Sequence, residues 1–305
     1  MVYFNYYLSV IIWQLFNPFG IYQSLLQNIG QVISIFQSFF RKDPVAYSPM
    51  SLPFYGKWKV INGGIDKLNS HSRNIISQRY AYDFILSGEE SKKLNTQKHN
   101  VNDYLTFNED VYSPNDGIII KVKNSIRDNK HAGSGWIDIW TTDIRGNFVI
   151  IKHDKNVYSL IAHLKRGSCC VKKGDIVKRG QIIGKCGNSG HSTQPHIHFQ
   201  LQDKVNWYFS KGLPIIFSGI MKKNENGDDI INMEQTYISK NDIVSNIKSE
   251  RAFYEKIKPE MNISKDLINP LVISLVNTPA IIIGGGFIYY TIIKSIFRIV
   301  LFIIR

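Results

Sequence analysis

The chain has 305 residues, of which 44% are hydrophobic and 12% aromatic, so it can build a folded core and is not a disordered protein. Its 37 Lys and Arg residues outnumber its 24 Asp and Glu residues, which gives a formal net charge of +13. That charge is unevenly placed, because residues 1–40 carry none and residues 41–265 carry a net +11. A basic block between two apolar ends excludes a plain cytosolic globule.

The N-terminal segment is apolar from residue 2 to residue 16 and is then broken by Asn17-Pro18. Apolar side chains recur at helical spacing between Ile21 and Phe39, opposite a row of glutamines and serines. The basic start and the small-residue cleavage site of a signal peptide are both missing. We expect residues 1–42 to be helical and membrane-associated. They could form a membrane hairpin, one spanning helix, or an amphipathic helix on the bilayer or on the C-terminal helix.

The central block, residues 43–247, has the pattern of a mainly antiparallel β domain. Turn sequences such as Pro114-Asn115-Asp116-Gly117 separate predicted strands at 118–122, 136–142, 147–152, 157–164, 180–184 and 196–201. The segment 174–184 is also typical of corners in lipoyl- and biotin-type β domains, but no carrier-lysine signature follows it. The cysteines Cys169, Cys170 and Cys186 are too few for a disulfide framework. We expect the three cysteines to serve as small apolar residues in or near strands, and one disulfide to Cys186 is the alternative.

The C-terminal part is predicted to attach the chain to a membrane. Alternating charges from residue 241 onward favour a helical connector, residues 248–267. Residues 268–305 follow, with an uncharged stretch at 271–293 that is long enough to cross a bilayer. Lys294, Arg298 and Arg305 come after it, and the positive-inside rule places such a tail in the cytosol. The central block is then extracytoplasmic at the cell membrane, although Arg41-Lys42 argues for the opposite side.

Two histidines in one predicted strand are the first sign of chemistry. Strand alternation places His196 and His198 on the face opposite to Ile197 and Phe199. A lone His-x-His pair is more often structural than metal-binding, but further possible ligands occur upstream: His71, Asp83 and His163. Two imidazoles and one carboxylate around Zn²⁺, with one position open for water, make a hydrolytic site. The pattern therefore points to a zinc hydrolase.

These residues lie in linked motifs that resemble the lysostaphin/LytM-type zinc endopeptidases, peptidase family M23. The motifs are Ile161-Ala162-His163-Leu164, the segment 171–184, Gly187-Asn188-Ser189-Gly190 and His196-Ile197-His198-Phe199. The turn at 111–117 is similar to a turn of the same family. The resemblance covers about residues 65–220 and implies a LytM-type, lipoyl- or barrel-sandwich-like β domain.

Carried over residue by residue, the resemblance implies a zinc ion held by His71, Asp83 and His198. It makes His163 and His196 catalytic histidines outside the ligand set, one a general base and the other an oxyanion donor, in an order left open. The first two ligands are usually four residues apart in this family, and here they are twelve apart. The segment Gln78–Phe84 resembles a variant of the family with the motif Q-R-Y-A-x-D-F, in which residues 72–79 must form a loop.

The family hydrolyses peptide bonds in peptidoglycan, in cross-bridges or stem peptides, so a membrane-anchored peptidoglycan endopeptidase is the leading hypothesis. The alternatives are a membrane-bound zinc peptidase that processes an exported peptide or protein, and a non-catalytic module that binds or activates at the cell wall. A basic block suits an anionic wall, and no nucleic-acid-binding motif is present. The oligomeric state is not indicated. We expect the remaining histidines, His99, His131, His153 and His191, to be surface or strand residues, though His153 and His191 could line the cleft.

Overall fold

A computed structural model describes residues 2–40, 49–66, 69–70, 72–88, 100–223, 229–232 and 235–247. These residues belong to one compact unit, Met1–Arg251, and the rest of the chain, Ala252–Arg305, is a separate unit. The predicted connector at 248–267 and the predicted membrane-spanning segment at 268–305 lie outside the described residues.

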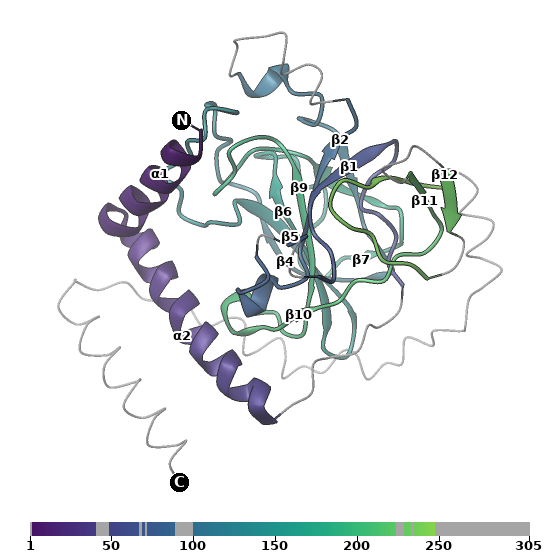
Figure 1. The fold of residues 1–305 in the computed structure, drawn as a ribbon, viewed down its shortest axis with the longest axis horizontal. Helices are drawn as coiled ribbons and strands as arrows, with labels where there is room; N and C mark the ends of the chain where they lie inside the picture. The colour runs from purple at the N-terminus through teal and green to yellow at the C-terminus, as the bar shows by residue number, and fades with distance from the viewer. Residues whose placement is uncertain are drawn as a thin grey trace. The chain divides into compact units, whose positions relative to one another are not determined.

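The described strands form one large antiparallel sheet and a second sheet of two strands (Figure 1). In the large sheet the order is β12-β11-β13-β1-β2-β9-β6-β5-β4-β7, with β10 paired to β9, while β3 pairs with β8. The strands are β1 Trp58–Asn62, β2 Tyr82–Leu86, β3 Asp110–Tyr112, β4 Gly117–Lys123, β5 Asn147–Asp154, β6 Val157–Leu164, β7 Ile176–Val177, β8 Ile182–Lys185, β9 Ile197–Gln202, β10 Gly212–Leu213, β11 Ile220–Lys223, β12 Asp229–Asn232 and β13 Ile243–Asn246. Three 3-10 turns connect them: η1 Ile76–Gln78, η2 Val101–Asp103 and η3 Trp207–Phe209. The prediction of a mainly antiparallel β fold is confirmed.

The main hydrophobic core lies on one face of the central strands. Phe84 of β2, Ile161 of β6 and Phe199 of β9 are fully buried in it. Each such side chain contributes about 1.5–3 kcal/mol when it leaves water. Because side chains alternate along a strand, burying these residues directs their neighbours Asp83 and His198 to the opposite face. The core therefore positions the site.

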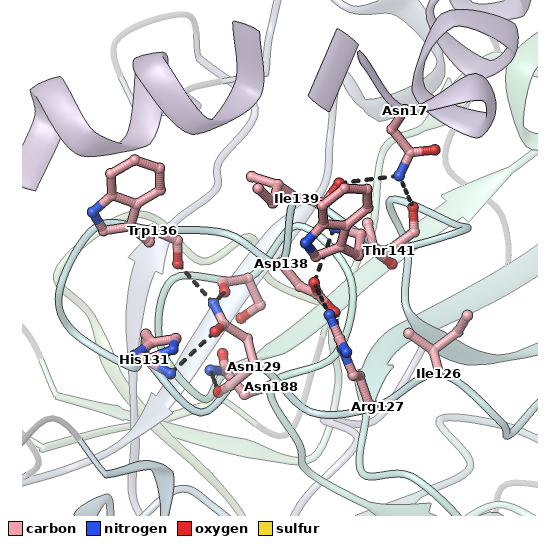
Figure 2. A network of polar contacts seen from close by, with 12 residues as sticks. Asn17, Ile126, Arg127, Asn129, His131, Trp136, Asp138, Ile139, Thr141 and Asn188 are labelled. Atoms are coloured by element: carbon pink, nitrogen blue, oxygen red, sulfur yellow. Dashed lines mark hydrogen bonds and ion pairs between the residues drawn. The ribbon is translucent and has the colours of Figure 1, made fainter. Parts of the chain in front are cut away.

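One strand prediction and one helix prediction need correction. Residues 136–142 are an irregular loop, because their backbone groups bond to side chains instead of to a neighbouring strand. The loop carbonyls of Ile139 and Thr141 accept hydrogen bonds from the Asn17 side chain at 3.0 Å and 3.1 Å, as Figure 2 shows. At the other end of the domain, residues 243–246, which we expected to begin a helical connector, are strand β13 paired with β1 and β11. The three cysteines are free thiols.

Two helices form the N-terminal segment: α1, Val2–Phe16, and α2, Pro18–Phe40. They are separated at Asn17, whose side-chain oxygen accepts hydrogen bonds from the backbone N–H groups of Phe19 (2.9 Å) and Gly20 (3.4 Å). A side-chain acceptor at this position caps the start of a helix, and proline is tolerated in its first turn. Among the described residues, no helix is both long and apolar enough to cross a membrane. The spanning alternatives for residues 1–42 therefore find no support.

The buried face of both helices is mostly polar or small. Seven residues at helical spacing form one stripe that faces the β domain: Ser9, Trp13, Asn17, Gly20, Gln23, Gly30 and Ser34. Trp13 Nε1 donates to the carbonyl of Thr141 at 3.0 Å. Gln23 donates to the carbonyl of Thr142 at 2.8 Å and accepts from the backbone N–H of Ile144 at 3.1 Å. We call α1 and α2 together the helical strap, because hydrogen bonds hold it along the β domain (Figure 1).

Gly30 lies close against η3, because a Cβ atom there would collide with the backbone carbonyl of Tyr208. Glycine costs a helix interior roughly 0.5–1 kcal/mol relative to alanine, so Gly30→Ala in an isolated helix would be stabilising. In this chain we expect Gly30→Ala to lower the free energy of unfolding by about 1–3 kcal/mol, as overpacking does. Urea unfolding followed by tryptophan fluorescence measures it. Asn28→Ala, at an exposed position of α2, is the matched control and should not destabilise. Equal stability of both variants would mean that α2 does not pack against η3.

Candidate active site

Three adjacent strands, β2, β9 and β6, bring the predicted site residues together. Asp83 of β2 and His198 of β9 are direct partners across the antiparallel ladder, and Ala162 of β6 is the partner of His198 on its other side. Directly opposed residues have their Cβ atoms about 4.5–5.5 Å apart on the same face. The ladder register therefore places a carboxylate beside an imidazole, although 115 residues separate them in sequence.

Asp83 and His198 form a buried pair with Oδ1 and Nδ1 2.9 Å apart. The other ring nitrogen, Nε2, lies 3.1 Å from Oε1 of Gln200. The Gln200 amide is oriented by its own Nε2, which donates to the Ser77 carbonyl and to Gln202 Oε1, each at 2.9 Å. Its Oε1 therefore accepts from His198 Nε2–H. In neutral His198 the Nδ1 lone pair then points at the carboxylate.

Two electron-pair donors that face each other in a buried site fit a cation, since each supplies a lone pair to it. Without a metal, a proton on Nδ1 takes that place. Burial lowers the pKa of His198, but the hydrogen bond to Asp83 and the charge of that carboxylate outweigh it, so the pKa is raised. The second oxygen of Asp83 accepts from Asn62 Nδ2 at 3.2 Å, which fixes the carboxylate plane. The donor set thus fits Zn²⁺ through Asp83 and His198.

His163 reaches the site through an unusual backbone conformation. It follows Ala162 at the end of β6, so regular alternation would turn its side chain away from His198. Its φ of 61° lies in the left-handed region, which costs a non-glycine residue about 1–2 kcal/mol. The ring centroid of His163 lies 4.7 Å from that of His196 and 5.8 Å from that of His198. The strained backbone therefore accompanies the placement of a third imidazole at the site.

The ring of His163 is held as the neutral Nδ1–H tautomer. Its Nδ1 lies 2.8 Å from the carbonyl oxygen of Ser189, which can only accept, so Nδ1 carries the proton and Nε2 carries a lone pair. Burial, with the neighbouring His196 and His198, lowers the pKa of His163 well below 6.5. A buried, neutral imidazole of this kind can accept a proton in a reaction.

His196 is oriented in the same way. Its Nδ1 lies 2.8 Å from the carbonyl of Gln194 and 3.2 Å from the hydroxyl of Ser192. Its Nε2 lies 3.7 Å from Oδ1 of Asp83. The loop 187–194 therefore holds the two histidines predicted to lie outside the ligand set, His163 through Ser189 and His196 through Ser192 and Gln194.

That loop is connected to the strap. Asn188 Nδ2 donates to the carbonyl of Asn129 at 2.7 Å, and Asn129 Nδ2 donates to the carbonyl of Trp136 at 2.7 Å (Figure 2). Trp13 of α1 packs edge-on against the His191 ring, with centroids 4.2 Å apart. The strap thus contacts the loop 187–194 directly, and it also contacts the 136–142 loop that supports it.

The structure brings four of the five predicted site residues together: Asp83, His163, His196 and His198. The fifth, His71, lies outside the described residues. Among the described residues, no cluster of three or more His, Cys, Asp or Glu side chains could hold a metal ion by itself. The metal set with His71 stays a prediction.

The neighbouring groups that orient these residues were not singled out as site residues from the sequence. Gln200 carried a weak signal, because alternation places it on the face of His196 and His198. Ser189, Ser192 and Gln194 act through backbone carbonyls or a hydroxyl in a glycine-containing loop. No pattern in the sequence assigns partners to such groups.

His153 and His191 lie outside the cluster of His163, His196 and His198. His153 is buried, with its ring nitrogens 2.7 Å from the carbonyl of Asp116 and 2.8 Å from the hydroxyl of Ser159. His191 lies under Trp13. Burial lowers the pKa of His153 to about 4 and that of His191 to about 3. Neither histidine belongs to the described cluster around Asp83, and the possibility that they line the cleft gains no support. His131 is an exposed loop residue, and His99 lies outside the described residues.

The lowered pKa of His153 predicts a specific acid sensitivity. The unfolded chain takes up a proton at His153 near pH 6.5, whereas the folded chain does so only near pH 4. Stability from the neutral form is complete above pH 6.5 and is lost as the pH falls toward 4. For His153 we expect about 2 kcal/mol of this loss between pH 7 and pH 5. His153→Gln should remove that part of the pH dependence in urea unfolding, whereas His131→Gln, on the surface, should not. A wild-type slope in His153→Gln would assign the effect to other groups.

Comparisons with known proteins match the part of the chain that carries the three clustered histidines. A model described as Peptidase family M23 matches residues 97–209, which include His163, His196 and His198 but not Asp83. The peptidoglycan DD-endopeptidase ShyA of Vibrio cholerae is 33% identical over 104 residues, which are 34% of this chain and 20% of ShyA. The glycyl-glycine endopeptidase ALE-1 of Staphylococcus capitis is 40% identical over 77 residues, which are 25% of this chain and 20% of ALE-1.

The catalytic domain of the antimicrobial peptidase lysostaphin from Staphylococcus simulans is similar in structure at 21% identity and a TM-score of 0.29. The match covers 52% of this chain and 88% of that domain. The chain spans about a fifth of the length of the two curated relatives, ShyA and ALE-1. The sequence motifs, the antiparallel fold and the family match agree with one another, and residues 97–209 of the chain match peptidase family M23.

Proposed function

We propose that this chain is a zinc metalloendopeptidase that hydrolyses peptide bonds in peptidoglycan at the outer side of a cell membrane. The observation that carries the proposal is the buried Asp83–His198 pair, 2.9 Å apart, with the rings of His163 and His196 beside it. A carboxylate and an imidazole that face each other suit a zinc ion, and two further histidines suit proton transfer. The relatives named as peptidoglycan and glycyl-glycine endopeptidases support this substrate class.

A bound zinc ion would supply a Lewis acid that polarises the scissile carbonyl and activates the attacking water. The ligands from this chain would be Asp83, His198 and the predicted His71. His163 and His196 both keep Nδ1 on a backbone carbonyl, which leaves Nε2 for exchange of a proton with the reacting groups. One of them would take the proton of the water on its Nε2 lone pair, and the other, protonated at Nε2, would donate a hydrogen bond to the carbonyl oxygen. Each of these two groups would accelerate the hydrolysis by a factor of about 10²–10⁴.

The test is digestion of purified cell-wall sacculi by the full chain, followed by mass spectrometry of the released fragments. We expect fragments with new amino termini, lost on addition of a chelator and restored by zinc. His196→Ala, which leaves the metal pair intact, is the matched inactive control. A protein that holds zinc but leaves sacculi intact would favour processing of an exported peptide. A protein that binds no zinc and cuts nothing would favour a non-catalytic wall-binding module.

The extracytoplasmic location rests on the charges around the predicted C-terminal span. The cations Lys294, Arg298 and Arg305 follow the uncharged stretch with no acidic residue among them, and such a tail stays in the cytosol. A basic central block with net charge +11 suits an anionic wall or membrane surface. Protease added to intact spheroplasts should degrade the block and spare a tag placed after Arg305. A protected block with a degraded tag would reverse the orientation and remove peptidoglycan as the substrate.

A further inference from the structure

The helical strap has the reverse of the usual polarity of a surface helix. In most surface helices the apolar stripe faces the core and the polar stripe faces water. In the strap, polar Ser9, Asn17 and Gln23 face the β domain, where they are buried and hydrogen-bonded. Among the described residues of the strap, Trp13 is the only large apolar side chain that is buried. Leu26 of α2 is partly buried against the hydrophobic cluster that contains Phe148 and Trp207, but most of the other large apolar side chains are directed away from the β domain.

The outward stripe is continuous at helical spacing. On α1 it contains Tyr3, Tyr7, Ile11 and Leu15, each four residues after the last, with exposed fractions of 81%, 64%, 50% and 62%. On α2 it includes exposed Ile21, Leu25 and Val32. Inward residues of both helices bond to the same loop, 134–144, so both outward stripes face away from the same domain. We call these exposed side chains the outer face of the strap. A contiguous apolar face of this length marks an interaction site.

We propose that the outer face of the strap lies in the interface of a lipid bilayer, parallel to the membrane plane. An interfacial helix buries its apolar face among acyl chains, and its polar face needs hydrogen-bond partners outside them. Here the β domain supplies these hydrogen-bond partners to the polar stripe. The inference names the surface by which the strap would meet the proposed membrane, and it does not depend on the proposed reaction.

The composition of the strap favours lipid over a protein partner. Residues 1–40 contain no charged side chain, so insertion desolvates no ion, and Arg41-Lys42 follow directly where anionic head groups would lie. Tyrosines are frequent on the outer face, and tyrosine is enriched at membrane interfaces. The two helices are about 23 and 35 Å long at about 1.5 Å per residue, and Figure 1 shows them at an angle to each other.

The test places an environment-sensitive fluorophore on the outer face of the full chain. Ile11→Cys and Val32→Cys are labelled with NBD in a chain that carries Cys169→Ser and Cys170→Ser, since Cys186 is buried and does not react. The control keeps exposed Cys170 as the labelled residue on the β domain. Each protein is reconstituted with vesicles of phosphatidylcholine and phosphatidylglycerol, with and without a lipid that carries a quencher near the head group. We expect several-fold lipid quenching at positions 11 and 32 and none at position 170.

A second pair of variants tests the contribution of the apolar stripe. Ile11→Glu should reduce lipid quenching of the label at position 32, because it places a charge on the outer face without touching the β domain. Ile176→Glu, at an isoleucine 64% exposed on β7, is the matched control and should leave the quenching unchanged. Circular dichroism should show all variants folded.

Three outcomes would overturn the proposal. Labels at positions 11 and 32 that stay in water while the chain sediments with vesicles would leave membrane attachment to another segment. Labels that are shielded from water but not quenched by lipid would mean that protein covers the outer face, either residues 252–305 or a second copy. A chain that does not sediment with vesicles would overturn both the strap inference and the proposed location. Digestion of sacculi, measured separately, reports on the reaction in each case.

Discussion

His198→Ala should lower the zinc affinity by at least about 100-fold. Removing a partner that only orients a metal ligand already lowers the metal affinity by ~10–100-fold. His198 is the proposed ligand whose Nδ1 faces Asp83 at 2.9 Å, so its removal leaves the carboxylate without its nearest partner in the metal pair. Competition of the purified protein with a chromophoric chelator measures the affinity, and circular dichroism confirms the fold. Activity on sacculi should disappear at micromolar zinc.

Two other variants test whether the loss of zinc affinity follows the proposed ligand set. Gln200→Leu removes the acceptor of His198 Nε2–H but no proposed ligand, so its zinc affinity should fall by about 10–100-fold. His196→Ala removes an imidazole that is not in the proposed ligand set and should keep its zinc. If His196→Ala lost the metal while His198→Ala kept it, the two histidines would have exchanged roles.

His163→Ala should bind zinc normally and hydrolyse peptides about 10²–10⁴-fold more slowly, the contribution of a positioned acid–base group. The ring of His163 is neutral, buried and 4.7 Å from that of His196, and no other part of the proposed mechanism replaces it. Steady-state rates on a fluorogenic peptide, with zinc content measured in parallel, separate the chemical step from metal loss. Full activity in this variant would assign His163 a purely structural role.

The backbone of His163 adds a second, independent measurement. Alanine inherits the strained φ of 61°, whereas glycine accepts it freely. His163→Gly should therefore be more stable to urea than His163→Ala by about 1 kcal/mol, although both should hydrolyse peptides equally slowly. Such a result would show that the backbone conformation which directs this imidazole into the site lowers the stability of the domain. Equal stabilities would mean that the conformation is relaxed in solution.

The sequence alone determined the class of domain and named the four residues that the structure brings together, Asp83, His163, His196 and His198. Alternation in 196–201 separates a core face, with Ile197 and Phe199, from a polar face, with His196 and His198, because a strand repeats every two residues. The linked motifs around His163 and the His-x-His pair identified the family. The bounds of β6, Val157–Leu164, equal those predicted, since an uninterrupted run of apolar and β-branched residues leaves little alternative.

Tertiary structure decided how these residues meet and where the apolar N-terminus goes. The register between β2 and β9 pairs Asp83 with His198, and strand pairing over this separation depends on the whole sheet rather than on local pattern. The positive φ of His163 overrides the alternation that a sequence argument must assume. The polarity of the strap could not be predicted either. Helical periodicity separates a polar from an apolar stripe, but it does not show that backbone groups of the loop 136–144 lack strand partners and bond to the polar stripe instead.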